Sequence, residues 1–192
     1  MNLNTITEVQ HPASMDQITQ WRDNYAWLGG GTWLFSEPQV ATDTLIDLDA
    51  LRWPALEQSA AGLEIAATCR IAELYRFVAP ADWRAAPLIR DCCNAFLASF
   101  KIWNAATIGG NICMSLPAGP MISLTTALDA VYTLWPRNAP PREVRAVDFV
   151  TGNHLNVLQP GELLTASMCR PPRCRSGSRS GTPVSPISDG PR

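Results

Sequence analysis

The sequence predicts an α+β fold that begins with a small α/β unit and continues into a second unit of strands and helices. Two kinds of pattern support this class. Short β-branched or alternating apolar runs, which are typical of strands, recur along the chain. Segments with one-sided apolar spacing, which are typical of helices, lie between them. The 192 residues, 46% of them apolar, suffice for one domain or for two small subdomains that share an interface.

Residues 1–53 alternate strand and helix patterns and form the predicted α/β unit. Ser14 and Gln17 have the spacing of a capping box, so we expect a helix from residue 15 to about residue 21. Three apolar runs in this unit have strand character: residues 7–9, 26–28 and 44–48.

Residues 54–168 form the second predicted subdomain, which begins at the break marked by Trp53 and Pro54. Four segments in it have strand character: residues 63–67, 130–134, 142–147 (an edge strand) and 162–166. Three segments carry an apolar helical stripe: residues 71–77, 88–96 and 121–128.

The composition changes at residues 169–192, which are rich in Arg, Ser, Gly and Pro and hold two large aliphatic residues, Val184 and Ile187. Such a segment buries too little surface to offset its ordering entropy. We expect it to be a disordered tail, or a frame-shifted or truncated end of the chain.

Charge and cysteine usage exclude several classes of function. The net charge of −2 attracts neither nucleic acid nor a membrane surface, and no apolar run approaches the ~18 residues of a spanning helix. The first ten residues lack a signal peptide pattern, so a cytoplasmic location is expected. The six cysteines form no C-x-x-C pair and the two histidines lie far apart, so we expect free, mostly buried thiols and no zinc or iron–sulfur site.

Two glycine-rich segments, residues 27–34 and 104–113, carry the main functional signal. Adjacent glycines allow positive φ and let backbone N–H groups approach a ligand closely. Successive N–H groups in a turn form a concavity that binds anions. Neither segment is a Walker A or G-x-G-x-x-G sequence. The pair suggests one ligand with two polar ends, such as a nucleotide with a diphosphate, and the alternative is two ordinary turns.

No side chain stands out as a general acid, base or nucleophile. The acidic residues are scattered, and we expect most to be helix caps or solvated surface: Asp47, Asp49, Asp91, Glu73 and Glu162. A bound cofactor would therefore have to carry any redox chemistry. Trp33 lies inside one glycine segment and Trp103 just before the other, so each could supply either a stacking surface or core volume.

Residues 102–113 together with 28–34 resemble the FAD-binding subunit or domain of molybdenum hydroxylases of the xanthine dehydrogenase and carbon monoxide dehydrogenase type. The match rests on an Ala-Thr-Ile-Gly-Gly-Asn sequence and a Gly-Gly-Gly-Thr sequence, and it extends over residues 5 to about 168. It implies a vanillyl-alcohol-oxidase-like, PCMH-type fold in two subdomains. A small α/β unit at 1–53 would precede a larger mixed or antiparallel sheet with flanking helices at 54–168.

The resemblance also implies a cofactor, FAD, and a set of residues that contact it. These residues are Gly29, Gly30, Gly31, Thr32, Trp33, Leu97, Thr107, Ile108, Gly109, Gly110, Asn111 and Leu164. Valine at both Gly109 and Gly110 would be expected to block the diphosphate. Three positions, Trp33, Trp103 and Pro120, hold residue types that differ from those common in the family.

The function implied by the resemblance is electron relay in a hetero-oligomer. An iron–sulfur small subunit and a molybdopterin large subunit would be the partners, and electrons would pass through FAD to NAD or another acceptor. One alternative is a truncated, non-catalytic remnant, because family members continue after Leu164 into a further C-terminal subdomain. The other is a stand-alone flavin oxidase.

Overall fold

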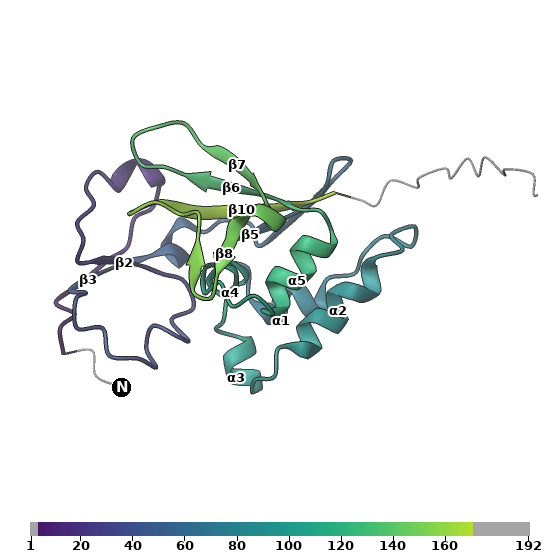
Figure 1. Ribbon diagram of the computed structural model, residues 1–192, viewed down its shortest axis with the longest axis horizontal. Coiled ribbons are helices and arrows are strands. Elements are labelled where there is room, and N and C mark those ends of the chain that lie inside the picture. Colours follow the sequence, from purple (N-terminus) through teal and green to yellow (C-terminus); the bar gives the residue numbers. More distant parts are fainter. Residues whose placement is uncertain (1–3, 171–192) are drawn as a thin grey trace, which may run out of the picture.

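The computed structural model describes residues 4–170 and confirms the α+β class. A three-stranded parallel sheet lies at one end of a five-stranded antiparallel sheet, and helices cover one face of the larger sheet (Figure 1). The tail was expected to begin at residue 169, and this boundary is wrong, because a strand continues to Cys169, which is buried. The rest of the predicted tail, from residue 171 onward, lies outside the described residues.

The smaller sheet has the order β1-β3-β2 and confirms the three strands expected before residue 53. Its strands are β1 (Glu8–Gln10), β2 (Tyr25–Leu28) and β3 (Thr44–Asp47). Leu45 and Ile46 of the central strand are buried, as expected for a parallel strand covered on both faces. Asp47 then caps a 3₁₀ turn, η2 (Leu48–Leu51), by accepting a hydrogen bond from the N–H of Asp49 at 3.0 Å.

The prediction of a helix from residue 15 to about residue 21 is wrong, because the chain forms only a 3₁₀ turn there, η1 (Met15–Gln17). The capping box does not close. The Ser14 side chain makes no cap bond, and Oε1 of Gln17 accepts from the N–H of Ala13 at 2.7 Å instead. Trp21 packs on Trp27 with ring centroids 4.5 Å apart, so apolar burial is reached without a helix.

The larger sheet has the order β4-β5-β10-β6-β7. Its strands are β4 (Leu56–Ser59), β5 (Gly62–Ala66), β6 (Val131–Trp135), β7 (Arg142–Arg145) and β10 (Leu163–Cys169). The central strand β10 pairs with β5 and β6, and β7 forms an edge as expected. The sequence analysis missed β4 because this other edge strand is largely polar and exposed.

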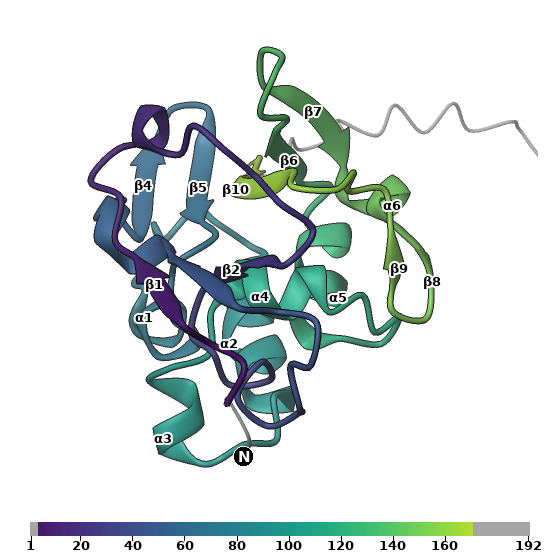
Figure 2. The same ribbon diagram turned by 90° about the vertical axis from the view of Figure 1, so that its left-hand side faces the viewer.

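The helices gather on one face of the larger sheet, with α2 against α5 and α4 against β5 and β10 (Figure 2). Three were expected: α1 (Ile71–Arg76), α2 (Ala86–Ala95) and α5 (Pro120–Ala127). Three short ones complete the set: α3 (Phe100–Trp103), α4 (Ile108–Cys113) and α6 (Ala146–Phe149). A small hairpin, β8 (Val150–Gly152) and β9 (Leu155–Asn156), follows α6.

The main core lies between these helices and the larger sheet. Tyr132 is fully buried there, stacks edge-on against Phe149 at 5.1 Å, and hydrogen-bonds the Thr125 hydroxyl at 2.6 Å. None of the helices within residues 4–170 combines the length and the apolar character that a membrane span requires.

Candidate cofactor site

The two glycine-rich segments touch each other in the fold. A Cβ on Gly29 would lie 2.9 Å from Oγ1 of Thr107, and a Cβ on Gly30 would overlap the carbonyl oxygen of Ala105. The loop after β2 can therefore lie against residues 105–107 only because both positions lack a side chain. This contact brings segments about 80 residues apart in the sequence to one site.

A cavity of about 480 Å³ opens between the two segments. This volume lies within the range of small-molecule and cofactor sites. The walls combine glycine backbone with apolar side chains, and no charged residue is among them. The lining residues are Trp27, Gly29, Gly30, Gly31, Thr32, Trp33, Leu34, Ser36, Phe96, Ile102, Ala106, Thr107, Gly110, Asn111, Cys113, Met114 and Leu116.

The first segment presents backbone donors to this cavity. Within the described residues, the N–H groups of Gly30, Gly31 and Thr32 donate no hydrogen bond to a protein acceptor. Gly31 has φ +66°, and a Cβ there would overlap the ring of Phe35, so the turn requires glycine at this position. The N–H of Phe35 closes the turn on the Gly31 carbonyl at 2.8 Å. The segment is thus an ordered turn with free donors, which suits an anion.

The second segment is not the loop that the sequence suggested, because residues from Ile108 onward form helix α4. The hydroxyl oxygen of Thr107 caps this helix by accepting from the N–H of Gly110 at 3.1 Å. The N–H of Gly109 donates to the carbonyl of Ala67 at 2.9 Å, and the N–H of Asn111 donates to Thr107 at 3.0 Å. The expectation of bare N–H donors at Gly109 and Gly110 is therefore wrong for this structure.

Side chains of the second segment still offer donors. The Thr107 oxygen accepts from Gly110, so its own hydrogen is left to donate. Oδ1 of Asn111 accepts from the N–H of Met121 at 3.1 Å, and within residues 4–170 its amide nitrogen has no acceptor. The second segment therefore offers a hydroxyl and an amide where the first offers backbone N–H groups.

Not every residue named from the resemblance reaches the cavity. Eight of the expected residues line it: Gly29, Gly30, Gly31, Thr32, Trp33, Thr107, Gly110 and Asn111. Ile108 and Gly109 are buried behind the wall, and a Cβ on Gly109 would lie only 2.5 Å from the Cβ of Ala67. Leu164 is 1% exposed within the core of the larger sheet, whereas Leu97 is 94% exposed and lies outside the lining.

The sequence analysis missed the apolar wall of the cavity, which includes Phe96, Ile102, Met114 and Leu116. Phe96 belongs to the predicted helical stripe of residues 88–96, and the others flank the glycine segment without a motif of their own. Their proximity to that segment was the signal that could have found them.

Beside the contact between the two glycine-rich segments, Arg70 links the smaller sheet to the rest of the fold. Its guanidinium forms an ion pair with Asp49, which follows β3, and donates to the Ala105 carbonyl at 2.5 Å. Oε2 of Glu73 accepts from the Arg70 N–H at 2.7 Å, so this acidic residue is a helix cap, as expected.

Glu162 departs from the expectation that it would be a cap or a solvated surface residue. Its side chain is 1% exposed and forms a two-pronged ion pair with Arg142, at 2.6 and 2.7 Å. The Arg142 hydrogen bonds hold the pKa of Glu162 below its ordinary value, against the opposing effect of burial.

The five described cysteines are free, and four of them are buried, which confirms the expectation for these positions. Burial raises the pKa of Cys69, Cys113 and Cys169 to about 12 and that of Cys93 to about 11. These thiols therefore stay protonated at neutral pH, and Cys113 contributes a neutral wall to the cavity. Over residues 4–170, His, Cys, Asp and Glu side chains do not gather in groups that could hold a metal ion.

Comparison with known proteins defines the class to which this fold and cavity belong. The family described as the FAD binding domain in molybdopterin dehydrogenase matches residues 4–168. The chain belongs to this family, whose cofactor is FAD. Among individual relatives, the medium chain of carbon monoxide dehydrogenase from Afipia carboxidovorans is 38% identical over 81 residues, which make up 42% of this chain and 27% of that protein.

Solved structures agree with this assignment. Reconstituted CO dehydrogenase from Oligotropha carboxidovorans superposes with a TM-score of 0.72 at 26% identity, covering 86% of this chain and 58% of that one. Quinoline 2-oxidoreductase from Pseudomonas putida 86 gives a TM-score of 0.77 at 23% identity, covering 90% and 61%, and shows similarity of fold alone. The chain thus spans less than two thirds of the length of these relatives.

Proposed function

We propose that the chain is the FAD-binding part of the electron-transfer subunit of a molybdenum hydroxylase. One observation carries this proposal: both glycine-rich segments line a single cavity with free backbone donors and apolar walls. A bound FAD would supply the electron-accepting and electron-donating chemistry that the side chains of this cavity lack.

The donors of the cavity fit the diphosphate of FAD. The N–H groups of Gly30, Gly31 and Thr32 would bind its oxygens, with the Thr107 hydroxyl and the Asn111 amide donating from the other segment. Ile108, Gly109 and Leu164 would support the site from behind, and Leu97 would contact the cofactor only if the surrounding chain moved. The apolar walls would exclude water from the ring systems of the cofactor.

The partners and the electron acceptor belong to the same proposal. An iron–sulfur small subunit and a molybdopterin large subunit would pass electrons to this chain, and NAD or another acceptor would remove them. The similarity to a carbon monoxide dehydrogenase medium chain supports this relay over a stand-alone oxidase. The free thiols of residues 4–170 agree with a reducing compartment, and we place the protein in the cytoplasm.

Purification of the full chain, with FAD added during refolding or lysis, tests the proposal. The protein should retain flavin through gel filtration at close to one FAD per chain, and it should be reduced by co-expressed iron–sulfur and molybdopterin subunits. A well-folded chain that binds no FAD would contradict the assignment of the cavity. A flavin that is reduced by a small substrate without partner subunits would contradict the relay.

A further inference from the structure

Trp33 differs from the other tryptophans in how it is packed. All seven lie within residues 4–170, and six of them pack against another aromatic ring or a hydrophobic cluster. Trp33 has neither kind of contact in that part of the chain, and it is 47% exposed at the cavity. An indole left half in water forgoes the burial that normally stabilises so large an apolar group.

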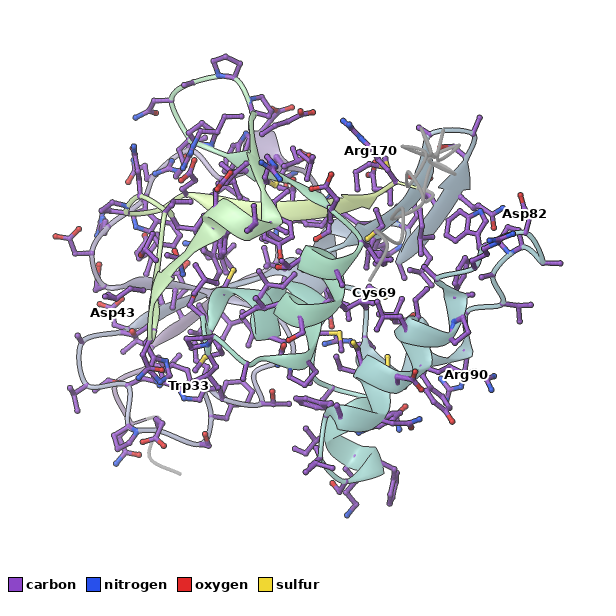
Figure 3. All side chains as sticks on the ribbon, turned by 45° about the vertical axis from the view of Figure 1, so that its right-hand side comes forward. Trp33, Asp43, Cys69, Asp82, Arg90 and Arg170 are labelled. Atoms are coloured by element: carbon purple, nitrogen blue, oxygen red, sulfur yellow. The ribbon has the colours of Figure 1, made fainter. Side chains whose placement is uncertain are left out.

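The backbone that carries this indole is held in place. The N–H and the hydroxyl of Ser36 both donate to the Trp33 carbonyl, at 2.8 and 2.7 Å. On the other side, the Gly31 turn is closed by the hydrogen bond from Phe35. Figure 3 shows Trp33 on the side of the molecule away from Arg90 and Asp82. The indole is thus attached to an ordered turn directly after the free donors of Gly30, Gly31 and Thr32.

The lining of the cavity limits how a ligand could be held beyond its phosphates. No charged side chain lines it, so an ion pair to a ring substituent is not available there. What the wall offers next to the donors is a large flat π-surface and aliphatic groups, including Leu34 and Met114. Planar heteroaromatic rings stack favourably on such a surface.

We propose that the Trp33 indole is the platform on which a planar ring of the bound dinucleotide stacks while the adjacent N–H groups hold its diphosphate. This inference rests on the proposed function, because it takes FAD as the ligand. Adenine and the flavin ring system share the required chemistry. Trp33 is therefore a residue that sets affinity for one ring of the cofactor.

Binding of FAD, ADP and FMN to the apo full-length chain, measured by calorimetry, tests this role. Trp33→Ala should weaken FAD binding by about tenfold or more, whereas Trp33→Phe, which keeps an aromatic face, should stay within about threefold of the wild type. Trp83→Phe is the matched control, since Trp83 packs on Phe77 outside the cavity and should leave all three affinities unchanged. Circular dichroism would verify that each variant is folded.

The two half-ligands identify the ring. Loss of ADP affinity in Trp33→Ala assigns adenine to the platform, and loss of FMN affinity assigns the flavin ring. A folded Trp33→Ala protein that binds FAD, ADP and FMN as the wild type does would overturn the role of Trp33 and leave the proposed function standing. A wild-type chain that binds none of the three would overturn both.

Discussion

Replacing Gly30 with alanine perturbs the contact that creates the cavity. The new Cβ would overlap the Ala105 carbonyl oxygen, and it would lie 2.5 Å from the Ala105 carbonyl carbon and 3.0 Å from Nη1 of Arg70. Carbon–carbon contacts normally settle at about 3.5–4.0 Å, so the loop must withdraw by roughly 1 Å. The obstacle is backbone, which cannot rotate away as the tip of a side chain could.

That displacement sets the expected magnitude. Overpacking of this kind costs about 1–3 kcal/mol in the free energy of unfolding. A shift of roughly 1 Å would also move the Gly30 and Gly31 N–H groups beyond hydrogen-bonding distance of the diphosphate that we propose they bind. The loss of one such charge-assisted bond, worth about 1.5–3 kcal/mol, weakens FAD binding at least tenfold.

Calorimetry with FAD and denaturant unfolding measure the two effects of Gly30→Ala. Gly152→Ala is the matched control, because a Cβ there meets only the side chain of Leu155, at 3.2 Å, in a hairpin outside the cavity. It should change neither quantity appreciably. If Gly30→Ala binds FAD and unfolds like the wild type, the contact between the two glycine segments does not exist as described.

The remaining predictions concern the second segment and the buried ion pair. Gly109→Ala, whose Cβ would lie 2.5 Å from the Cβ of Ala67 and 2.8 Å from its carbonyl oxygen, should lower the free energy of unfolding by about 1–3 kcal/mol. Gly110→Ala should cost less, because a Cβ there meets only the side-chain oxygen of Thr107, at 2.9 Å, and denaturant curves would compare the two variants. Thr107→Val should cost about 1 kcal/mol through the lost helix cap and also weaken FAD binding, and Thr107→Ser should restore both. Glu162→Gln should cost about 1–3 kcal/mol, less than a fully buried pair because the Arg142 side chain is 38% exposed. Since the folded pKa of Glu162 is lowered, its contribution is complete above the unfolded value of about 4.3 and is lost as the pH falls through the folded pKa.

Each of these has an outcome that would contradict it. Equal stability of the Gly109 and Gly110 variants would refute the close packing of α4 on the end of β5. A Thr107→Ser protein as weak as Thr107→Val would deny the hydroxyl any role. An acid unfolding profile that is the same for the Glu162→Gln variant and the wild type would show that the ion pair does not govern acid stability.

The strands with alternating or β-branched apolar runs could be predicted from sequence, because the residues of each strand alone show which side chains are to be buried. The edge strand β4 could not, since its residues are polar and its pairing with β5 is decided by the sheet. The convergence of the two glycine segments was likewise anticipated from their composition.

The state of the second segment could not be predicted in the same way. A Gly-Gly pair suits both a turn and a helix start, and the choice depends on the distant carbonyl of Ala67, which binds the N–H of Gly109. Leu164 could not be placed from sequence either. It is buried because β10 is the central strand of the larger sheet, and the order of strands in a sheet is not visible in the adjacent residues.

The cavity lies where the sheet β1-β3-β2 meets the rest of the chain, with Arg70 and Asp49 bridging the two parts alongside it. A ligand bound in this cavity would contact both the N-terminal sheet and the rest of the fold. The two parts could then separate only after the ligand had dissociated. By mass action, a ligand at a hundred times its dissociation constant adds about 2.7 kcal/mol to the joined state. Heating the apo chain should therefore release the N-terminal sheet first, whereas the loaded chain should come apart in one event.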